Sequence, residues 1–233
     1  MDEFLKVVVE GGTAFVFNIL LIVSVAGFAW WRRKHVTAFL DDLRIKSFGV
    51  STEGLQVERF EDKVKRAYVK QNLGPPSEDD KVRIKNIRRK LAPLIAGRRL
   101  LWVDDNPVGN TEERAAFVDM RVDVQASRST AEALRELQDP GNVFDVVISD
   151  WRRPHDDKPD EPAGIGLLHE LQDHKIQVPV VFYHGKVSQE ELANRRKLAL
   201  SNGAIGTTGS PGELLEMTAG ALVQGAMRSE AQP

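Results

Sequence analysis

Two stretches of the sequence decide the fold: LLWVDDNP at residues 100–107 and FDVVISDW at residues 144–151. Each is a short apolar run that ends in aspartate. Asp104 and Asp105 follow the first run, and Asp150 follows the second. A continuous apolar run of this length is typical of a strand that is buried on both faces of a parallel sheet. The two stretches therefore predict two buried strands with acids at their carboxyl ends.

The C-terminal half of the chain repeats this alternation of apolar runs and helical stretches. Further short runs are VDVQA at 122–126, VPVVFY at 178–183 and AIG at 204–206. Helical stretches follow the runs at 112–120, 130–139, 165–173, 189–201 and 213–224. Five such units predict an α/β domain with a five-stranded parallel, doubly wound sheet and helices on both faces.

The three acids are predicted to meet at one edge of this sheet. Ligands of open α/β sheets bind outside the carboxyl ends of the strands, where Asp104, Asp105 and Asp150 lie. Crowded carboxylates repel one another, and Mg²⁺, a hard ion that prefers oxygen ligands, relieves that repulsion. An aspartate can also attack a phosphoryl donor and carry an aspartyl phosphate. We therefore expect a metal site formed by these three residues, with Mg²⁺ as the cofactor.

The order of these segments resembles a known family. LLWVDDNP and FDVVISDW are followed by GIGLLHEL at 164–171, VPVVFYHG at 178–185 and the ending SNGAIG...SPGELL at 201–215. In order and spacing they are similar to the receiver domain of bacterial response regulators, over about residues 98–225. The resemblance implies a flavodoxin-like, receiver-type fold and a role in signal transduction.

The resemblance also implies roles for individual residues. Asp104 and Asp105 would be the metal-binding acidic pair, Asp150 the phosphoacceptor, and the backbone carbonyl of Arg152 a further metal ligand. The partner would be a signalling protein such as a histidine kinase. Oligomerisation stays open.

The sequence departs from the family at two positions. The family has Ser or Thr after the fourth strand and Lys after the fifth, whereas this chain has His184 and Ser210. His184 can donate a hydrogen bond to a phosphoryl group near neutral pH, or it can be a local structural residue. Arg152 and Arg153 can replace the missing cation, or they can form surface salt bridges. An atypical receiver, or pseudo-receiver, is the interpretation that follows.

An uncharged stretch near the N-terminus predicts a membrane anchor. Residues 11–31, GGTAFVFNILLIVSVAGFAWW, are long enough to cross about 30 Å of hydrocarbon as a helix. Arg32, Arg33 and Lys34 follow it, whereas residues 1–10 carry three acids and one lysine. By the positive-inside rule we expect a single-pass protein of a bacterial inner membrane, with its N-terminus outside and its C-terminal domain in the cytoplasm. The alternative is a buried globular helix.

Residues 35–97 are interpreted as a juxtamembrane helical linker. A small hairpin is predicted at 45–58 and a helix at 60–71, and the stretch NLGPPSEDD at 72–80 ends this helix and begins the next at Ser77. The predicted domains are the tail and membrane helix at 1–34, the linker at 35–97, the receiver-like domain at 98–226 and a disordered tail at 227–233.

The last helix of this linker is strongly basic. Residues 81–99 contain eight Lys or Arg residues and no acid. The predicted apolar stripe consists of Val82, Ile87, Leu91, Leu94 and Ile95. Such a helix can bind anionic lipid or a phosphate-rich partner, or it can be a helix with a solvated basic face.

Composition narrows the classes of function. The formal net charge of −2 argues against a nucleic-acid binder, and the absence of cysteine excludes disulfides and thiolate catalysis. Two other functions stay open. One is a nucleotide-processing defence effector of the TIR-like kind, which would need a catalytic glutamate from among Glu161, Glu170 and Glu190. The other is a purely structural membrane scaffold.

Overall fold

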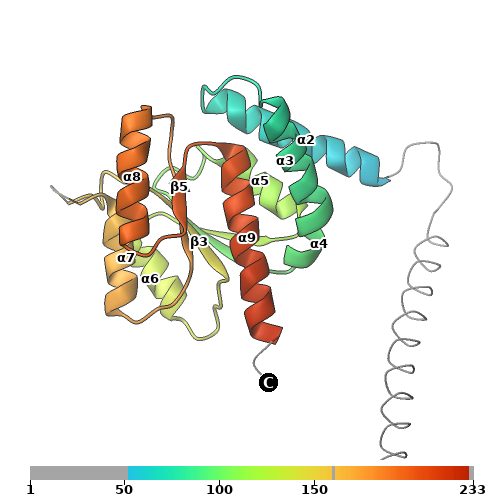
Figure 1. Ribbon diagram of the computed structural model, residues 1–233. Coiled ribbons are helices and arrows are strands. Elements are labelled where there is room, and N and C mark those ends of the chain that lie inside the picture. The colour runs from blue at the N-terminus through green and yellow to red at the C-terminus, as the bar shows by residue number, and fades with distance from the viewer. Residues whose placement is uncertain (1–51, 159–160, 231–233) are drawn as a thin grey trace, which may run out of the picture. The chain divides into compact units, whose positions relative to one another are not determined.

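The protein folds around a parallel sheet. The computed structural model describes residues 52–158 and 161–230 (Figure 1). Its five strands lie in the order β2-β1-β3-β4-β5, which is the flavodoxin-like, doubly wound arrangement. The predicted α/β fold class is thereby confirmed. The predicted membrane helix at 11–31 lies outside the described residues, and within those residues no helix is long and apolar enough to span a bilayer.

The strands pair in parallel from one edge of the sheet to the other. They are β1 (Arg99–Val103), β2 (Asp123–Ser127), β3 (Val146–Asp150), β4 (Val180–Tyr183) and β5 (Gly206–Thr208). The prediction of a strand at 204–206 was wrong by two residues. Thr207 and Thr208 are about 1% exposed, so this strand is buried although its residues are polar. An apolar run could not reveal it.

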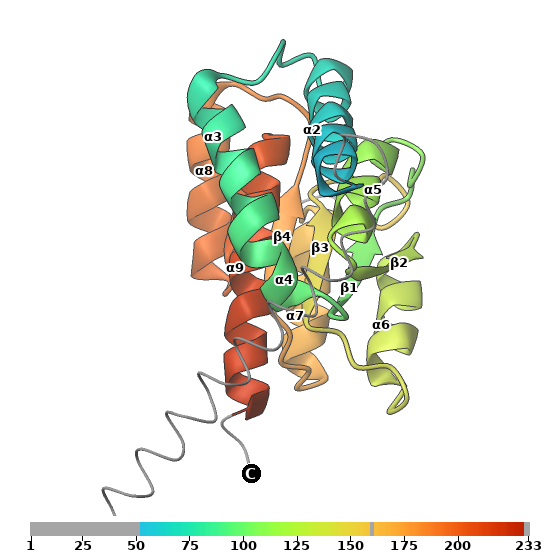
Figure 2. The same cartoon turned by 90° about the vertical axis from the view of Figure 1, so that its right-hand side faces the viewer.

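Five helices cover the two faces of the sheet. They are α5 (Thr111–Asp119), α6 (Thr130–Gln138), α7 (Ala163–Asp173), α8 (Gln189–Ser201) and α9 (Pro211–Glu230). Residues of α5 and α9 share a hydrophobic cluster on one face, and residues of α6, α7 and α8 share the cluster on the other (Figures 1 and 2). The hydroxyls of Ser129 and Ser188 cap α6 and α8, which explains where these helices begin.

The helices that precede the sheet pack against α5 and α9 (Figure 2). They are α2 (Thr52–Lys70), α3 (Glu78–Asn86), the π-helical turn η1 (Ile87–Leu91) and α4 (Ala92–Ile95). Phe60, Val64 and Ile95 are buried in the same cluster as Trp102 and Leu214. The segment interpreted as a linker therefore shares its core with the sheet.

Two expectations for this segment need correction. The hairpin predicted at 45–58 is wrong from Thr52 onward, because α2 begins there. In the basic helix, Ile87 and Ile95 are buried as predicted, but Val82 is 60% and Leu94 is 55% exposed. Val82 lies in α3 before the π-helical turn, and Ile84 is the buried residue of that helix. The turn at Ile87–Leu91 shifts the register that follows it, and the helical stretch ends at Ile95. By contrast, Ser77 caps α3 as expected.

Candidate metal centre

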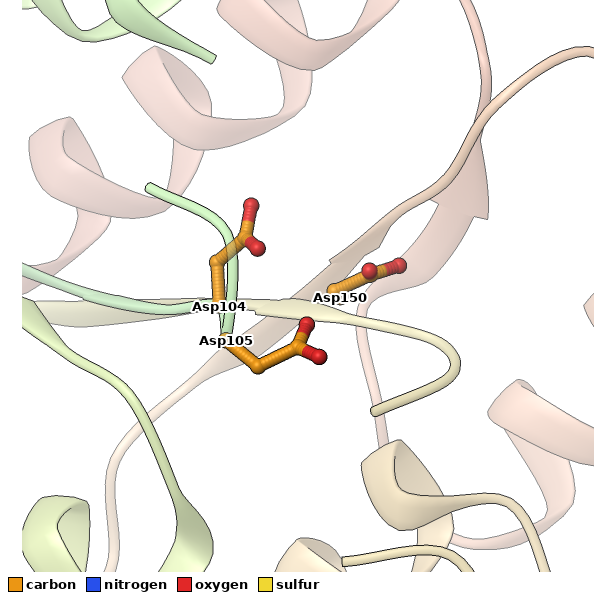
Figure 3. Close-up of side chains that lie close together, drawn as sticks. All are labelled: Asp104, Asp105 and Asp150. Carbon is orange, nitrogen blue, oxygen red and sulfur yellow. The ribbon is translucent and has the colours of Figure 1, made fainter. Parts of the chain in front are cut away.

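The structure brings the three predicted acids together. Asp104 and Asp105 directly follow β1, and Asp150 is the last residue of β3. These strands are neighbours, with Val103 opposite Ser149. One carboxylate oxygen from each aspartate lies within 4.8 Å of the others, as the close-up in Figure 3 illustrates.

Asp104 is the most constrained of the three acids. Its side chain is buried, and one carboxylate oxygen accepts the backbone N–H of Asn106 at 2.7 Å. The other oxygen accepts a hydrogen bond from the side-chain amide of Asn110. Two donors therefore hold this carboxylate in place, which pre-organises a ligand for a cation.

Asp150 carries an unfavourable charge. Burial, and then the neighbouring charge of Asp104, raise the pKa of Asp150 from 3.8 to about 6. The backbone N–H groups of Arg152 and Trp151 and the charge of Arg153 act in the opposite direction. A bound cation would remove the penalty, because it favours the ionised carboxylate.

The donor set fits Mg²⁺. All three side chains offer hard oxygen ligands of the kind that Mg²⁺ prefers, and one oxygen of each lies within 4.8 Å of the others. Asp104, Asp105 and Asp150 would hold the ion, and Mg²⁺ would supply the positive charge that favours their ionised form.

The acids open into a pocket of about 150 Å³ that contains no cationic side chain among the described residues lining it. The lining residues are Gln71, Asp104, Asp105, Asn106, Gly109, Asn110, Asp150, Tyr183, His184 and Gly185. They include no glutamate, so Glu161, Glu170 and Glu190 lie elsewhere.

His184 lines the pocket without joining the acids. Its Nδ1–H donates to the carbonyl of Gly185 at 2.7 Å, and its buried Nε2 has no hydrogen-bond partner. Burial, together with the charge of Arg195, lowers the pKa of His184. Both effects disfavour the charged form of the ring. Phosphate sensing by His184 stays a prediction.

The two arginines after Asp150 have different surroundings. Arg152 is exposed, and its Nε donates to Asp157 at 2.7 Å. Arg153 is fully buried. Its guanidinium donates hydrogen bonds to the side chains of Asp156, Ser149 and Thr130 and to the backbone carbonyls of Asp150 and Ala163. Neither arginine lines the pocket. Metal ligation by the Arg152 carbonyl stays a prediction.

Ser210, which the sequence resemblance aligned with the lysine of receiver domains, belongs to a structural cap. Its hydroxyl accepts the N–H of Glu213 at 3.4 Å at the start of α9. It also lies 3.1 Å from the hydroxyl of Tyr68 in α2. The side chain at this position therefore contacts the N-terminal helices.

Sequence reasoning missed several residues of the pocket. Asn106 and Asn110 follow the acidic pair closely, so the short spacing in DDNPVGN was an available signal. Gln71 and Tyr183 had no such signal. Gln71 reaches the pocket from α2, and the Tyr183 hydroxyl donates to buried Glu113 at 2.9 Å.

Comparison with known proteins finds no matching family model and no matching curated protein. Solved structures that resemble this chain are receiver domains. The receiver domain of response regulator 1452 from Francisella is 22% identical over 55% of this chain and 98% of its own, with a TM-score of 0.43. A response regulator receiver domain protein from Clostridium thermocellum is 20% identical over 58% and 99%, with a TM-score of 0.45. One from Methanospirillum hungatei is 19% identical over 56% and 98%, with a TM-score of 0.43.

Proposed function

We propose that this chain is a receiver-type signalling module whose acidic pocket binds Mg²⁺ and which acts through protein contacts. The observation that carries the proposal is the meeting of Asp104, Asp105 and Asp150 at the carboxyl ends of β1 and β3. The raised pKa of Asp150 supports it, since a cation would relieve the cost of its charge.

Mg²⁺ binding can be tested with the full chain by calorimetry and thermal unfolding. We expect saturating Mg²⁺ to raise the Tm of the wild type, because a ligand that binds only the folded state stabilises it. Asp105→Asn should abolish the shift. Asp173→Asn, which removes an exposed acid outside the pocket, is the matched control and should respond like the wild type. An equal shift in all three proteins would refute the proposal.

A second part of the proposal assigns phosphate acceptance to Asp150. A carboxylate oxygen of Asp150 would attack phosphorus, and the bond from phosphorus to the donor would break with its electron pair left on the donor. Incubation with acetyl phosphate and Mg²⁺, followed by intact-mass measurement, should show one phosphoryl adduct that Asp150→Asn lacks. Mg²⁺ binding without an adduct would identify a pseudo-receiver.

The membrane anchor and the partner belong to the same proposal. The uncharged stretch at 11–31 and its basic flank support a single span with the described domain in the cytoplasm. A histidine kinase is the partner that the receiver resemblance suggests. Alkaline extraction of membranes tests the anchor: the full chain should stay in the membrane fraction, and a chain that lacks residues 11–31 should be released.

A further inference from the structure

The end of α2 forms part of the wall of the acidic pocket. Gln71 directly follows this helix and lines the pocket, although it precedes the whole sheet in sequence. Its amide Nε2 donates to Asn110 Oδ1 and to Glu113 Oε1, both at 3.4 Å. A side chain from the N-terminal segment thus takes part in the hydrogen bonding of the site.

The two partners of Gln71 have further contacts in the site: Asn110 donates to Asp104, and Glu113 accepts from Tyr183 at the end of β4. Asn110 uses its Nδ2 to donate to Asp104, while its Oδ1 accepts from Gln71. An amide has one acceptor end and one donor end, so a donor at the oxygen directs the nitrogen towards Asp104. Gln71 thereby selects the orientation in which Asn110 holds the carboxylate.

A second contact ties the same turn of α2 to the other side of the site. The Tyr68 hydroxyl lies 3.1 Å from Ser210 Oγ in the loop between β5 and α9. A Cβ atom at Gly212 would lie 2.6 Å from the Tyr68 hydroxyl, so the glycine permits this close approach. The last turn of α2 therefore rests on two loops at the carboxyl edge of the sheet.

We propose that Gln71 is a positioning residue of the acidic pocket and that, through it, cation binding and the docking of α2 stabilise each other. The inference rests on the proposed Mg²⁺ site. Coupling between two equilibria is reciprocal. If docking of α2 raises the affinity for Mg²⁺ by some factor, bound Mg²⁺ raises the equilibrium constant for docking of α2 by the same factor. α2 is thus the element that responds to the state of the pocket.

The first test compares Mg²⁺ affinities of full-length variants by calorimetry. Gln71→Met keeps the size of the side chain but removes the donor, and we expect about five-fold weaker binding, the equivalent of one neutral hydrogen bond. Arg66→Ala is the control, because it breaks the α2–α5 pair with Glu112 without touching the pocket. It should bind within about two-fold of the wild type. Equal weakening in both variants would show that Gln71 only holds the helix, and would overturn its positioning role.

The second test measures hydrogen exchange of the α2 amides with and without Mg²⁺. We expect Mg²⁺ to slow exchange in the wild type by about five-fold and to have little effect in Gln71→Met at a saturating concentration. Unchanged exchange in a wild type that binds Mg²⁺ would refute the coupling and leave the proposed function intact. A wild type that binds no Mg²⁺ would instead remove the proposed function, and the coupling with it.

Discussion

The ionised carboxylate of Asp150 destabilises the folded protein. Its pKa is raised from 3.8 to about 6 by burial and by the charge of Asp104. Between these two pH values the folded state binds more protons than the unfolded state. Stability therefore falls as pH rises through this window, and the cost is fully present above pH 6.

Replacing Asp150 with Asn should remove this cost. Without Mg²⁺ at pH 8, we expect Asp150→Asn to raise the free energy of unfolding by roughly 2–3 kcal/mol, and the gain should shrink towards pH 4. Urea denaturation at pH 4, 6 and 8 in the presence of a chelator measures it. A gain that does not depend on pH would show that charge is not its origin.

Ser210 contributes its hydroxyl to the start of α9 and to the contact with α2. Ser210→Lys removes the cap of α9 and the contact with Tyr68, so we expect a loss of about 1–2 kcal/mol in the free energy of unfolding. Ser210→Thr keeps the hydroxyl and should stay within about 0.5 kcal/mol of the wild type. Chemical denaturation of both variants checks this, and a fully stable Lys variant would contradict it.

At the scale of elements, the connection between β3 and α7 depends on an ion pair between fully buried Arg153 and Asp156, whose side chain is 17% exposed. Arg153 Nε donates to Asp156 at 3.1 Å, and its other donors join the end of β3 to the beginnings of α6 and α7. Arg153 also donates to the backbone carbonyl of Asp150 at 3.0 Å. The predicted alternative of a surface salt bridge is confirmed for Arg152, which pairs with Asp157, whereas Arg153 is buried.

Breaking this pair should destabilise the fold strongly. Arg153→Met leaves Asp156 without its cation, and we expect a loss of about 3–5 kcal/mol. Arg152→Met removes an exposed pair and should cost at most about 1 kcal/mol. Thermal and urea unfolding of the two neighbouring variants measure the difference. Similar losses would mean that burial of Arg153 is not decisive.

At the scale of the whole molecule, the N-terminal helices complete the core. Phe60, Val64, Ile87 and Ile95 are at most 3% exposed and share a cluster with the sheet. Burial of four such side chains contributes roughly 6–12 kcal/mol, which is comparable to the whole stability of an ordinary domain.

A chain that begins at residue 98 should therefore fail to form a stable receiver-like domain. We expect the fragment 98–233 to unfold without cooperativity and to bind a hydrophobic dye, whereas the fragment 52–233 should unfold in one cooperative transition. Near-ultraviolet circular dichroism and calorimetry compare them. Cooperative unfolding of the shorter fragment would show that the helices are dispensable.

Local pattern was sufficient for the first four strands and for the three acids. Apolar runs predicted β1, β3 and β4, and their order placed Asp104, Asp105 and Asp150 at one edge, because parallel strands end on the same side of a sheet. The predicted Ser77 cap was also local, since a cap involves neighbouring residues. By contrast, β5 was misplaced. Its threonines are polar, so they give no apolar run, and neighbouring elements bury them.

The sequence by itself determined the α/β class and the residues of the acidic cluster, because both depend on periodicity and on the residue at the end of a strand. Only the tertiary structure decided the lowered pKa of His184, the burial of Arg153 and the entry of Gln71 into the pocket. These depend on contacts between residues far apart in the chain, such as Gln71 with Glu113 and Tyr68 with Ser210. Burial and hydrogen bonding of this kind arise only when the elements pack, so no local pattern encodes them.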